Sequence, residues 1–217
     1  MMRIVILCVF AANALRAQQP MPHPESGTHA DSMARAVASI VRLPPSAFPE
    51  IPRAVREVLE FRDCLIPQRH VSIGDTTLAG READRAVRSN VLRGQFFERG
   101  KFAWAVLCSA HGITSIVFLP DDGSLLSTAS GQEMTELSSR PDATWIQPDG
   151  GGAWTLRATM FLAKASAIDR ARDGAKLDRA EKARPVHDGL VMADMSDGSG
   201  YTIYWTGRRW IQVASYD

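Results

Sequence analysis

Apolar and polar residues alternate strictly near the C-terminus of the chain. Tyr201, Ile203 and Trp205 fall on one side of an extended segment, and the residues between them fall on the other. A period of two residues is typical of a β-strand, and glycine-containing turns border this segment on both sides. The pattern predicts an antiparallel meander of three strands, at residues 190–195, 201–205 and 210–213.

A second group of strands is predicted in the middle of the chain. The apolar run at 103–108 is short and continuous, which is typical of a largely buried strand. The turn at Ala110-His111-Gly112 then directs the chain back on itself. We expect strands at 91–96, 103–108 and 113–119, with weaker candidates at 124–127, 144–146 and 154–161.

Helical periodicity is limited to short segments. Apolar residues spaced along one stripe predict a helix over residues 53–62. Further short helices are expected after the capping residues at 31–32, ending at the prolines 44–45, and at 133–138 and 163–172. The sequence therefore predicts an α+β fold, a single domain that is mainly antiparallel β-sheet with a few short helices.

The N-terminal segment has the pattern of a secretory signal peptide. Arg3 gives a positive start, an apolar run covers 4–14, and the small residue Ala17 precedes a polar stretch. The run is shorter than the roughly 20 apolar residues that cross a bilayer, and a short buried helix is the alternative interpretation. We expect residues 1–17 to be a signal peptide, 18–30 a disordered lead and 31–217 a single globular domain, periplasmic or secreted.

Two cysteines remain once the segment with Cys8 is removed. An even number of cysteines in an oxidising compartment favours a disulfide, here between Cys64 and Cys108. Two buried thiols that never meet are the alternative. Neither cysteine has a Cys or His at zinc-finger spacing, so we assign no metal site to them.

The overall charge is close to neutral. Lys and Arg number 25 against 24 Asp and Glu, which gives a formal net charge of +1. Such a balance gives no reason to expect nucleic acid as a partner. After the N-terminal segment, no run is long and apolar enough to predict a membrane span. The partner expected is a protein or a glycan.

One internal segment resembles a known repeat unit. Its two parts are Gly-Gln-Phe-Phe-Glu at 94–98 and Trp-Ala-Val-Leu-Cys at 104–108. The segment resembles one unit of the FG-GAP/VCBS-type repeat, which in multi-copy proteins builds propeller blades, often with calcium in the loop. The chain is also similar to a group of uncharacterised secreted bacterial proteins, which share Cys-x-Ile-Pro-Gln, here at 64–68, and a closing aromatic strand pair, here at 203–210. This second resemblance brings no known activity.

The loop of this unit departs from the calcium-binding pattern. It offers one carboxylate, Glu98, beside the cations Arg99 and Lys101. Ca²⁺ takes about six to eight oxygen ligands, so we expect no calcium here. The unit also occurs once, whereas a propeller needs several blades, so we expect no propeller.

No segment carries a signature of catalysis. Carboxylates in the turns at 121–123 and 194–198 are typical turn residues. His187 and Asp188 are adjacent, and adjacent residues do not face each other in a strand. Ser109 near His111 is better interpreted as part of a hairpin turn, and no Gly-x-Ser-x-Gly motif supplies a nucleophile. We therefore assign no catalytic, cofactor-binding or metal-binding residue.

The sequence favours an exported, non-catalytic domain that binds a protein or glycan. The candidate binding face consists of Tyr201, Ile203, Trp205 and Trp210, for which core packing is the competing interpretation. One alternative function is a small extracytoplasmic hydrolase, whose residues would converge around His111 or His187 with Asp188 or Asp194. Another is an inhibitor of an envelope hydrolase.

Overall fold

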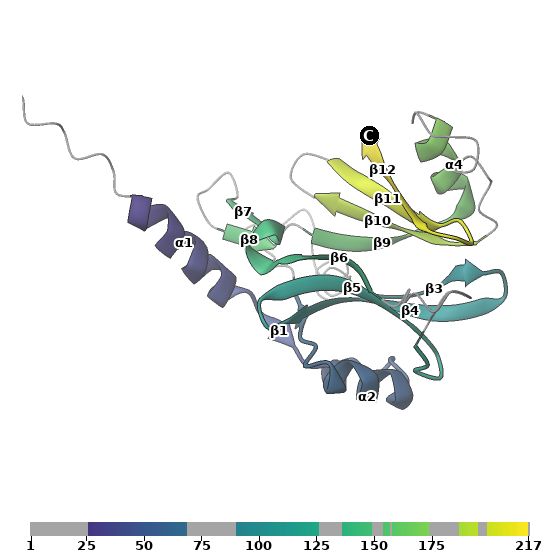
Figure 1. Ribbon diagram of the computed structural model, residues 1–217, viewed down its shortest axis with the longest axis horizontal. Coiled ribbons are helices and arrows are strands. Elements are labelled where there is room, and N and C mark those ends of the chain that lie inside the picture. The colour runs from purple at the N-terminus through teal and green to yellow at the C-terminus, as the bar shows by residue number, and fades with distance from the viewer. Residues whose placement is uncertain are drawn as a thin grey trace, which may run out of the picture.

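The computed structural model describes residues 26–68, 90–125, 136–148, 154–156, 158–173, 187–194 and 199–216. They form an α+β domain dominated by antiparallel sheet, as the sequence predicts (Figure 1). The first large sheet has the order β3-β4-β5-β6, and the second has the order β12-β11-β10-β9. Their strands are β3 (Val91–Glu98), β4 (Lys101–Ala110), β5 (Ile113–Pro120), β6 (Glu136–Pro141), β9 (Ala158–Ala163), β10 (Gly189–Asp194), β11 (Ser199–Trp205) and β12 (Trp210–Tyr216).

Shorter elements surround these two sheets. Two short antiparallel pairs join β1 (Arg42–Leu43) to β2 (Ile66–Pro67) and β7 (Ile146–Pro148) to β8 (Trp154–Leu156). The α-helices are α1 (Ser26–Ser39), α2 (Arg53–Phe61) and α4 (Ala165–Asp173). Single 3₁₀ turns occur at η1 (Pro45–Ala47) and η3 (Asp142–Trp145). In Figure 1, α1 projects from one end of the molecule.

The domain is layered, with α2 outside the first sheet and α4 outside the second (Figure 1). Three apolar clusters fill the spaces between these layers. The first lies between α2 and the first sheet, and the second lies between the two sheets. The third joins Ile168 of α4 to Tyr204, Ile211 and Val213 of the second sheet. Each sheet therefore packs against another layer on both faces, although α4 covers only part of the second sheet.

The position of β4 in the middle of the domain explains why residues 103–108 form a continuous apolar run. Side chains alternate between the two faces of a strand. Trp104, Val106 and Cys108 face α2, whereas Ala105 and Leu107 face the second sheet. Both faces are buried, so no position requires a polar residue.

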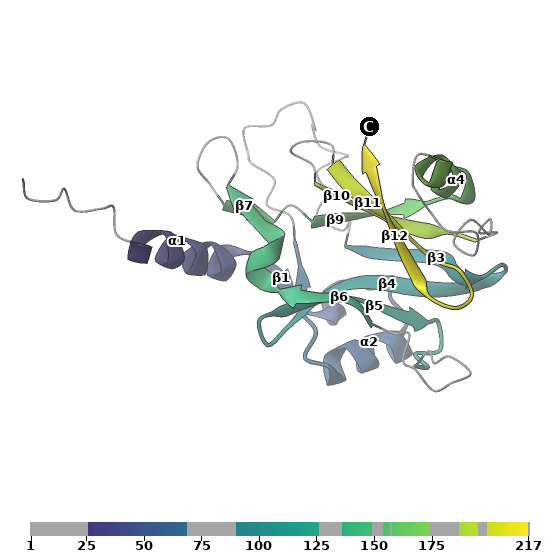
Figure 2. The ribbon, with the colours of Figure 1, turned by 45° about the horizontal axis from the view of Figure 1, so that its top comes forward.

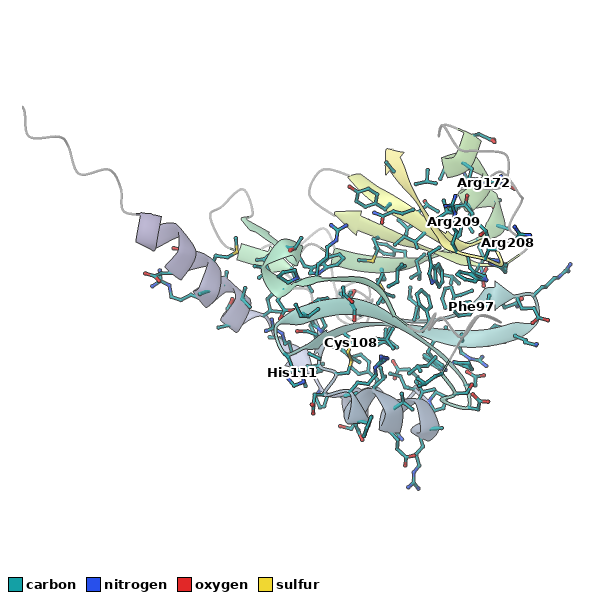
Figure 3. The ribbon with its side chains drawn as sticks, in the orientation of Figure 1. Phe97, Cys108, His111, Arg172, Arg208 and Arg209 are labelled. Carbon is teal, nitrogen blue, oxygen red and sulfur yellow. A yellow bond between two sulfur atoms is a disulfide. The ribbon has the colours of Figure 1, made fainter. Side chains whose placement is uncertain are left out.

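A disulfide joins Cys64 to Cys108, as predicted. Their Cα atoms are 5.2 Å apart and the two residues are 44 positions apart in the chain. The sulfur atoms lie between the first sheet and α2 (Figure 3), and both residues are buried. The bond therefore fixes the C-terminal end of α2 to the centre of the first sheet.

Helix α2 ends in a left-handed residue. Asp63 has φ 54°, and the following amide of Cys64 donates to the carbonyl of Leu59 at 3.0 Å. The amide of Asp63 donates to the carbonyl of Glu60 at 3.0 Å. These two bonds form a Schellman motif, in which glycine is the usual left-handed residue. The motif turns the chain directly into the disulfide.

Several predicted boundaries are wrong. Residues 136–138, expected in a helix over 133–138, belong to β6, and 133–135 lie outside the described residues. These residues form a strand because they pair with β5, where Leu137 lies opposite Ile116. In the expected strand at 144–146, the first two residues belong to η3 and only Ile146 lies in a strand, β7, whereas Ser124 and Leu125 are not in a strand. The expected strand at 154–161 is two strands, β8 and β9.

The described residues cover only part of the N-terminal segment for which predictions were made. The proposed signal peptide at 1–17 and residues 18–25 lie outside the described residues. Helix α1 begins at Ser26, which is inside the segment expected to lack structure. Among the helices that the structure describes, none is long and apolar enough to cross a membrane.

Candidate functional site

The predicted aromatic binding face is mostly buried between the two sheets. Ile203 is 2% exposed and Trp205 is 6% exposed, whereas Tyr201, at the far end of β11, is 48% exposed. Trp210 stacks on Phe118 of the first sheet, with ring centroids 4.4 Å apart. The face points toward the first sheet, and core packing is the interpretation that holds for Ile203, Trp205 and Trp210.

The repeat-like segment contributes to the same aromatic core. Phe97, at the end of β3, packs edge-on against Trp210 at 5.3 Å and against Phe118 at 5.6 Å (Figure 3). Trp205 packs edge-on against Trp210 at 5.5 Å. Such pairs contribute about 0.5–1.5 kcal/mol each beyond their buried area. The aromatic residues therefore hold the two sheets together.

In the part of the chain that the structure describes, the buried His187 contacts a backbone carbonyl and no carboxylate. His187 Nδ1 lies 2.9 Å from the backbone carbonyl oxygen of Asp188. The carboxylate of Asp188 instead accepts the amide of Gln95 at 3.0 Å and the ammonium of Lys164 at 3.0 Å. Asp188 thus ties the start of β10 to β3, and its role is structural. The side chain of Asp194 lies outside the described residues.

The second candidate histidine, His111, does lie near a carboxylate, but on the surface. His111 Nε2 is 3.3 Å from Asp63 Oδ2, and both side chains are exposed. Figure 3 shows His111 at the tip of the β4–β5 hairpin. The hydroxyl of Ser109 does not join this pair, because it donates to Asp142 at 2.8 Å. The partner of His111 is therefore Asp63, which the sequence analysis did not single out.

The structure also contains a buried polar cluster centred on Asp142, which the sequence analysis did not predict. Its carboxylate forms an ion pair with Arg42 at 2.9 Å and accepts hydroxyl bonds from Ser109 at 2.8 Å and Thr114 at 2.5 Å. Arg42 also donates to the carbonyl of Val37 at 2.9 Å. The cluster joins the end of α1 to the β4–β5 hairpin. Both carboxylate oxygens of Asp142 accept bonds from protein donors, so the role of the cluster is also structural.

An open apolar groove lies along the outer side of α2. It has a volume of about 560 Å³. Phe61 is 90% exposed at one side of it, and Leu125, in the loop after β5, is 60% exposed. The lining residues are Ala54, Glu57, Val58, Phe61, Arg62, Asp122 and Leu125. A phenylalanine this exposed beside an open groove is the most unusual surface feature of the described residues.

The loop after β5 is held against α2 at one residue and against the first sheet at another. Gly123 has φ 73°, and a Cβ atom there would lie 2.7 Å from the carbonyl oxygen of Ala54. Only glycine combines this left-handed backbone with such a close approach to the helix. Next to it, Asp121 accepts the indole N–H of Trp104 at 2.8 Å and pairs with Arg93 at 2.5 Å. The loop is therefore anchored to both α2 and the first sheet.

Charged groups border the groove without filling it. Glu57 pairs with Arg53 at 2.7 Å, one turn earlier on α2. The carboxylate of Asp122 accepts the backbone amide of Ser124 at 2.9 Å, and this bond lowers the pKa of Asp122 below its ordinary value. The bond from Arg93, reinforced by that from Trp104, likewise lowers the pKa of Asp121. Both loop carboxylates are therefore anionic at neutral pH.

The groove has the chemistry of a binding surface. It combines apolar side chains with an ionic rim, an arrangement common to protein interfaces. Within the described parts of the chain, no three His, Cys, Asp or Glu side chains come together as a metal site would require. Phe61 itself had a sequence signal, because it falls off the apolar stripe of Val55, Val58 and Leu59 in an amphipathic helix.

Comparison with protein-family models, with curated proteins and with solved structures finds no match. The resemblance to a single FG-GAP/VCBS-type unit therefore stays a prediction.

Proposed function

We propose that this protein is an exported recognition domain that binds an apolar segment of another protein in the groove along α2. The observation that carries the proposal is Phe61, which is 90% exposed beside Leu125 at the edge of an open groove. Complete burial of a phenylalanine side chain contributes about 1.5–3 kcal/mol. A partner that covers Phe61 and Leu125 would recover this free energy.

The rigidity of the groove supports the same proposal. One wall is a helix fixed by a disulfide, and the other is a loop anchored through Asp121 and Gly123. A wall that is already ordered loses little conformational entropy on binding. The apolar lining favours a protein partner over a glycan, because the aromatic platform expected for sugar stacking is buried between the sheets.

Export is part of the proposal and has its own support. The N-terminal pattern is that of a signal peptide. The disulfide between Cys64 and Cys108 is of the kind that persists in oxidising compartments. A recognition domain of this kind acts in the periplasm or outside the cell. Inhibition of an envelope hydrolase is one form that such recognition takes.

The proposal is tested by substitution of the groove residues in the full exported protein. Phe61→Ser and Leu125→Ser remove apolar surface from the groove, and Tyr201→Ser removes a comparable exposed aromatic from the second sheet. Envelope extract is passed over each immobilised variant, and the bound proteins are identified. We expect one partner to be held by the wild type and by Tyr201→Ser, and to be lost from both groove variants. Equal capture by all four proteins contradicts the proposal.

A further inference from the structure

The four outer strands of the two large sheets differ in how their free edges are protected. At β3, the amide and carbonyl of Gln95 both bind Asp188, at 3.0 Å and 2.9 Å. At β9, the amide of Met160 reaches the side-chain oxygen of Asn90 at 3.4 Å. At β6, the strand contains Arg140 and Pro141, and its pairing with β5 is irregular. Each of these devices blocks the approach of another strand.

Strand β12, the outermost strand of the second sheet (Figures 1 and 2), shows none of these devices among the described residues. Its sequence, Trp-Ile-Gln-Val-Ala-Ser-Tyr, contains no charged residue and no proline. Its register with β11 is continuous over seven residue pairs, without a bulge. A long, uncharged and regular edge of this kind is a template for pairing with another strand.

The hairpin geometry shows which backbone groups of β12 face outward. The amide of Thr206 donates to the carbonyl of Arg209 at 3.0 Å, so these residues form a hydrogen-bonded pair. Hydrogen-bonded and non-hydrogen-bonded pairs alternate along an antiparallel ladder. Ile211 and Val213 therefore bond to β11, and the N–H and C=O groups of Trp210, Gln212 and Ala214 point away from it. Across the described residues, these outward groups have no other backbone partner.

We propose that β12 pairs antiparallel with β12 of a second copy of this chain, which joins the two second sheets into one sheet of eight strands. The outward groups of Gln212 and Ala214 fix the register, because each bonds to the other residue in the second copy. Val213 then lies opposite its own counterpart on the twofold axis, as a closed dimer requires. Pairs of β-branched residues at such positions stabilise a sheet.

The charges near β12 favour this antiparallel arrangement over a parallel one. Arg208 and Arg209 are exposed in the turn that precedes β12 (Figure 3). In an antiparallel dimer the two arginine-bearing turns lie at opposite ends of the paired strands. In a parallel dimer they would lie side by side and repel each other. The dimer surface is separate from the groove along α2, so it does not depend on the proposed function.

The test is the mass of the exported protein in solution, together with a proline placed in the free edge. Ala214 is exposed and its amide points outward, so Ala214→Pro removes a donor from the free edge and none from the ladder with β11. Ala214→Ser keeps the amide and is the matched control. We expect twice the mass of one chain for the wild type and for Ala214→Ser, and the mass of one chain for Ala214→Pro.

Amide hydrogen exchange gives a second readout that needs no folded proline variant. We expect the amides of Gln212 and Ala214 to be protected in concentrated wild-type protein and to exchange freely on dilution. A wild type with the mass of one chain at about 100 μM, a concentration far above a micromolar Kd, overturns the proposal. A dimer that persists in Ala214→Pro also overturns the proposal, and so does a dimer in which these two amides exchange freely. Protection of the amides only by an extended peptide from another protein overturns it as well.

Discussion

The carboxylate of Asp121 accepts the indole N–H of Trp104 at 2.8 Å, and this bond connects the core of the first sheet to the loop beside α2. Trp104 belongs to the cluster that also contains Val55 and Leu59 of α2. Trp104 thus belongs to the core beneath the helix and holds the loop through its indole N–H. The shape of the groove depends on this connection.

Replacement of Asp121 is expected to loosen the loop. Asp121→Ala removes the acceptor of Trp104 and the partner of Arg93. Because the pair is partly exposed, we expect a loss of about 1 kcal/mol in the free energy of unfolding. Urea denaturation measures this loss, and hydrogen exchange at the indole N–H of Trp104 reports how well the loop shields it. A variant as stable as the wild type, with Trp104 equally shielded, would show that the bond does not hold the loop.

The same carboxylate predicts a dependence of stability on pH. Its pKa is lowered in the folded protein, chiefly by the bond from Arg93. A lowered pKa means that the stabilisation is complete above the unfolded carboxyl pKa of about 3.9 and is lost as pH falls through the folded value. The stability difference between wild type and Asp121→Asn should therefore be constant above about pH 5 and shrink below about pH 4. A difference that persists unchanged at low pH contradicts this account.

The buried cluster around Asp142 is expected to matter more for stability than Asp121. Asp142→Ala leaves Arg42 largely buried without its carboxylate partner. Loss of one member of a buried ion pair costs about 3 kcal/mol or more. Thermal and urea unfolding measure the effect, and Asp31→Ala, at an exposed position of α1, is the matched control with a change of about 0.5 kcal/mol or less. Similar stabilities for the two variants would mean that the cluster is not a structural anchor.

The disulfide has two measurable consequences, one for the mass of the exported protein and one for its free energy of unfolding. The exported protein should be two hydrogens lighter before reduction than after, and no free thiol should react with an alkylating reagent. Because the two cysteines are 44 positions apart in the chain, replacing both by alanine is expected to lower the free energy of unfolding by about 4 kcal/mol. Two thiols that alkylate without reduction would contradict the assignment.

The sequence predicted the elements whose patterns are strong and local. The alternation at 201–205, the apolar run at 103–108 and the stripe in 53–62 all correspond to observed elements. The prediction for β6 failed because its partner is β5, and Leu137 alone does not indicate a strand. Strand pairing over such a distance is a tertiary effect that local propensity does not contain.

The candidate site was harder to predict than the fold. The alternation of aromatic residues in β11 would look the same whether that face were buried or exposed. The face is buried because the second sheet packs on the first. The groove depends on a contact between Gly123 and Ala54, which are far apart in the chain. Only the position of Phe61 outside the apolar stripe of its helix was visible in the sequence.

The groove along α2 is tested most directly by a photoreactive phenylalanine analogue placed at position 61 of the exported protein, with position 201 as the control. Illumination in living cells crosslinks the analogue to whatever protein covers it. The proposed function predicts one discrete crosslinked partner from position 61 that is absent from position 201. No crosslink from position 61, or the same products from both positions, would contradict the proposal that this groove is the recognition site.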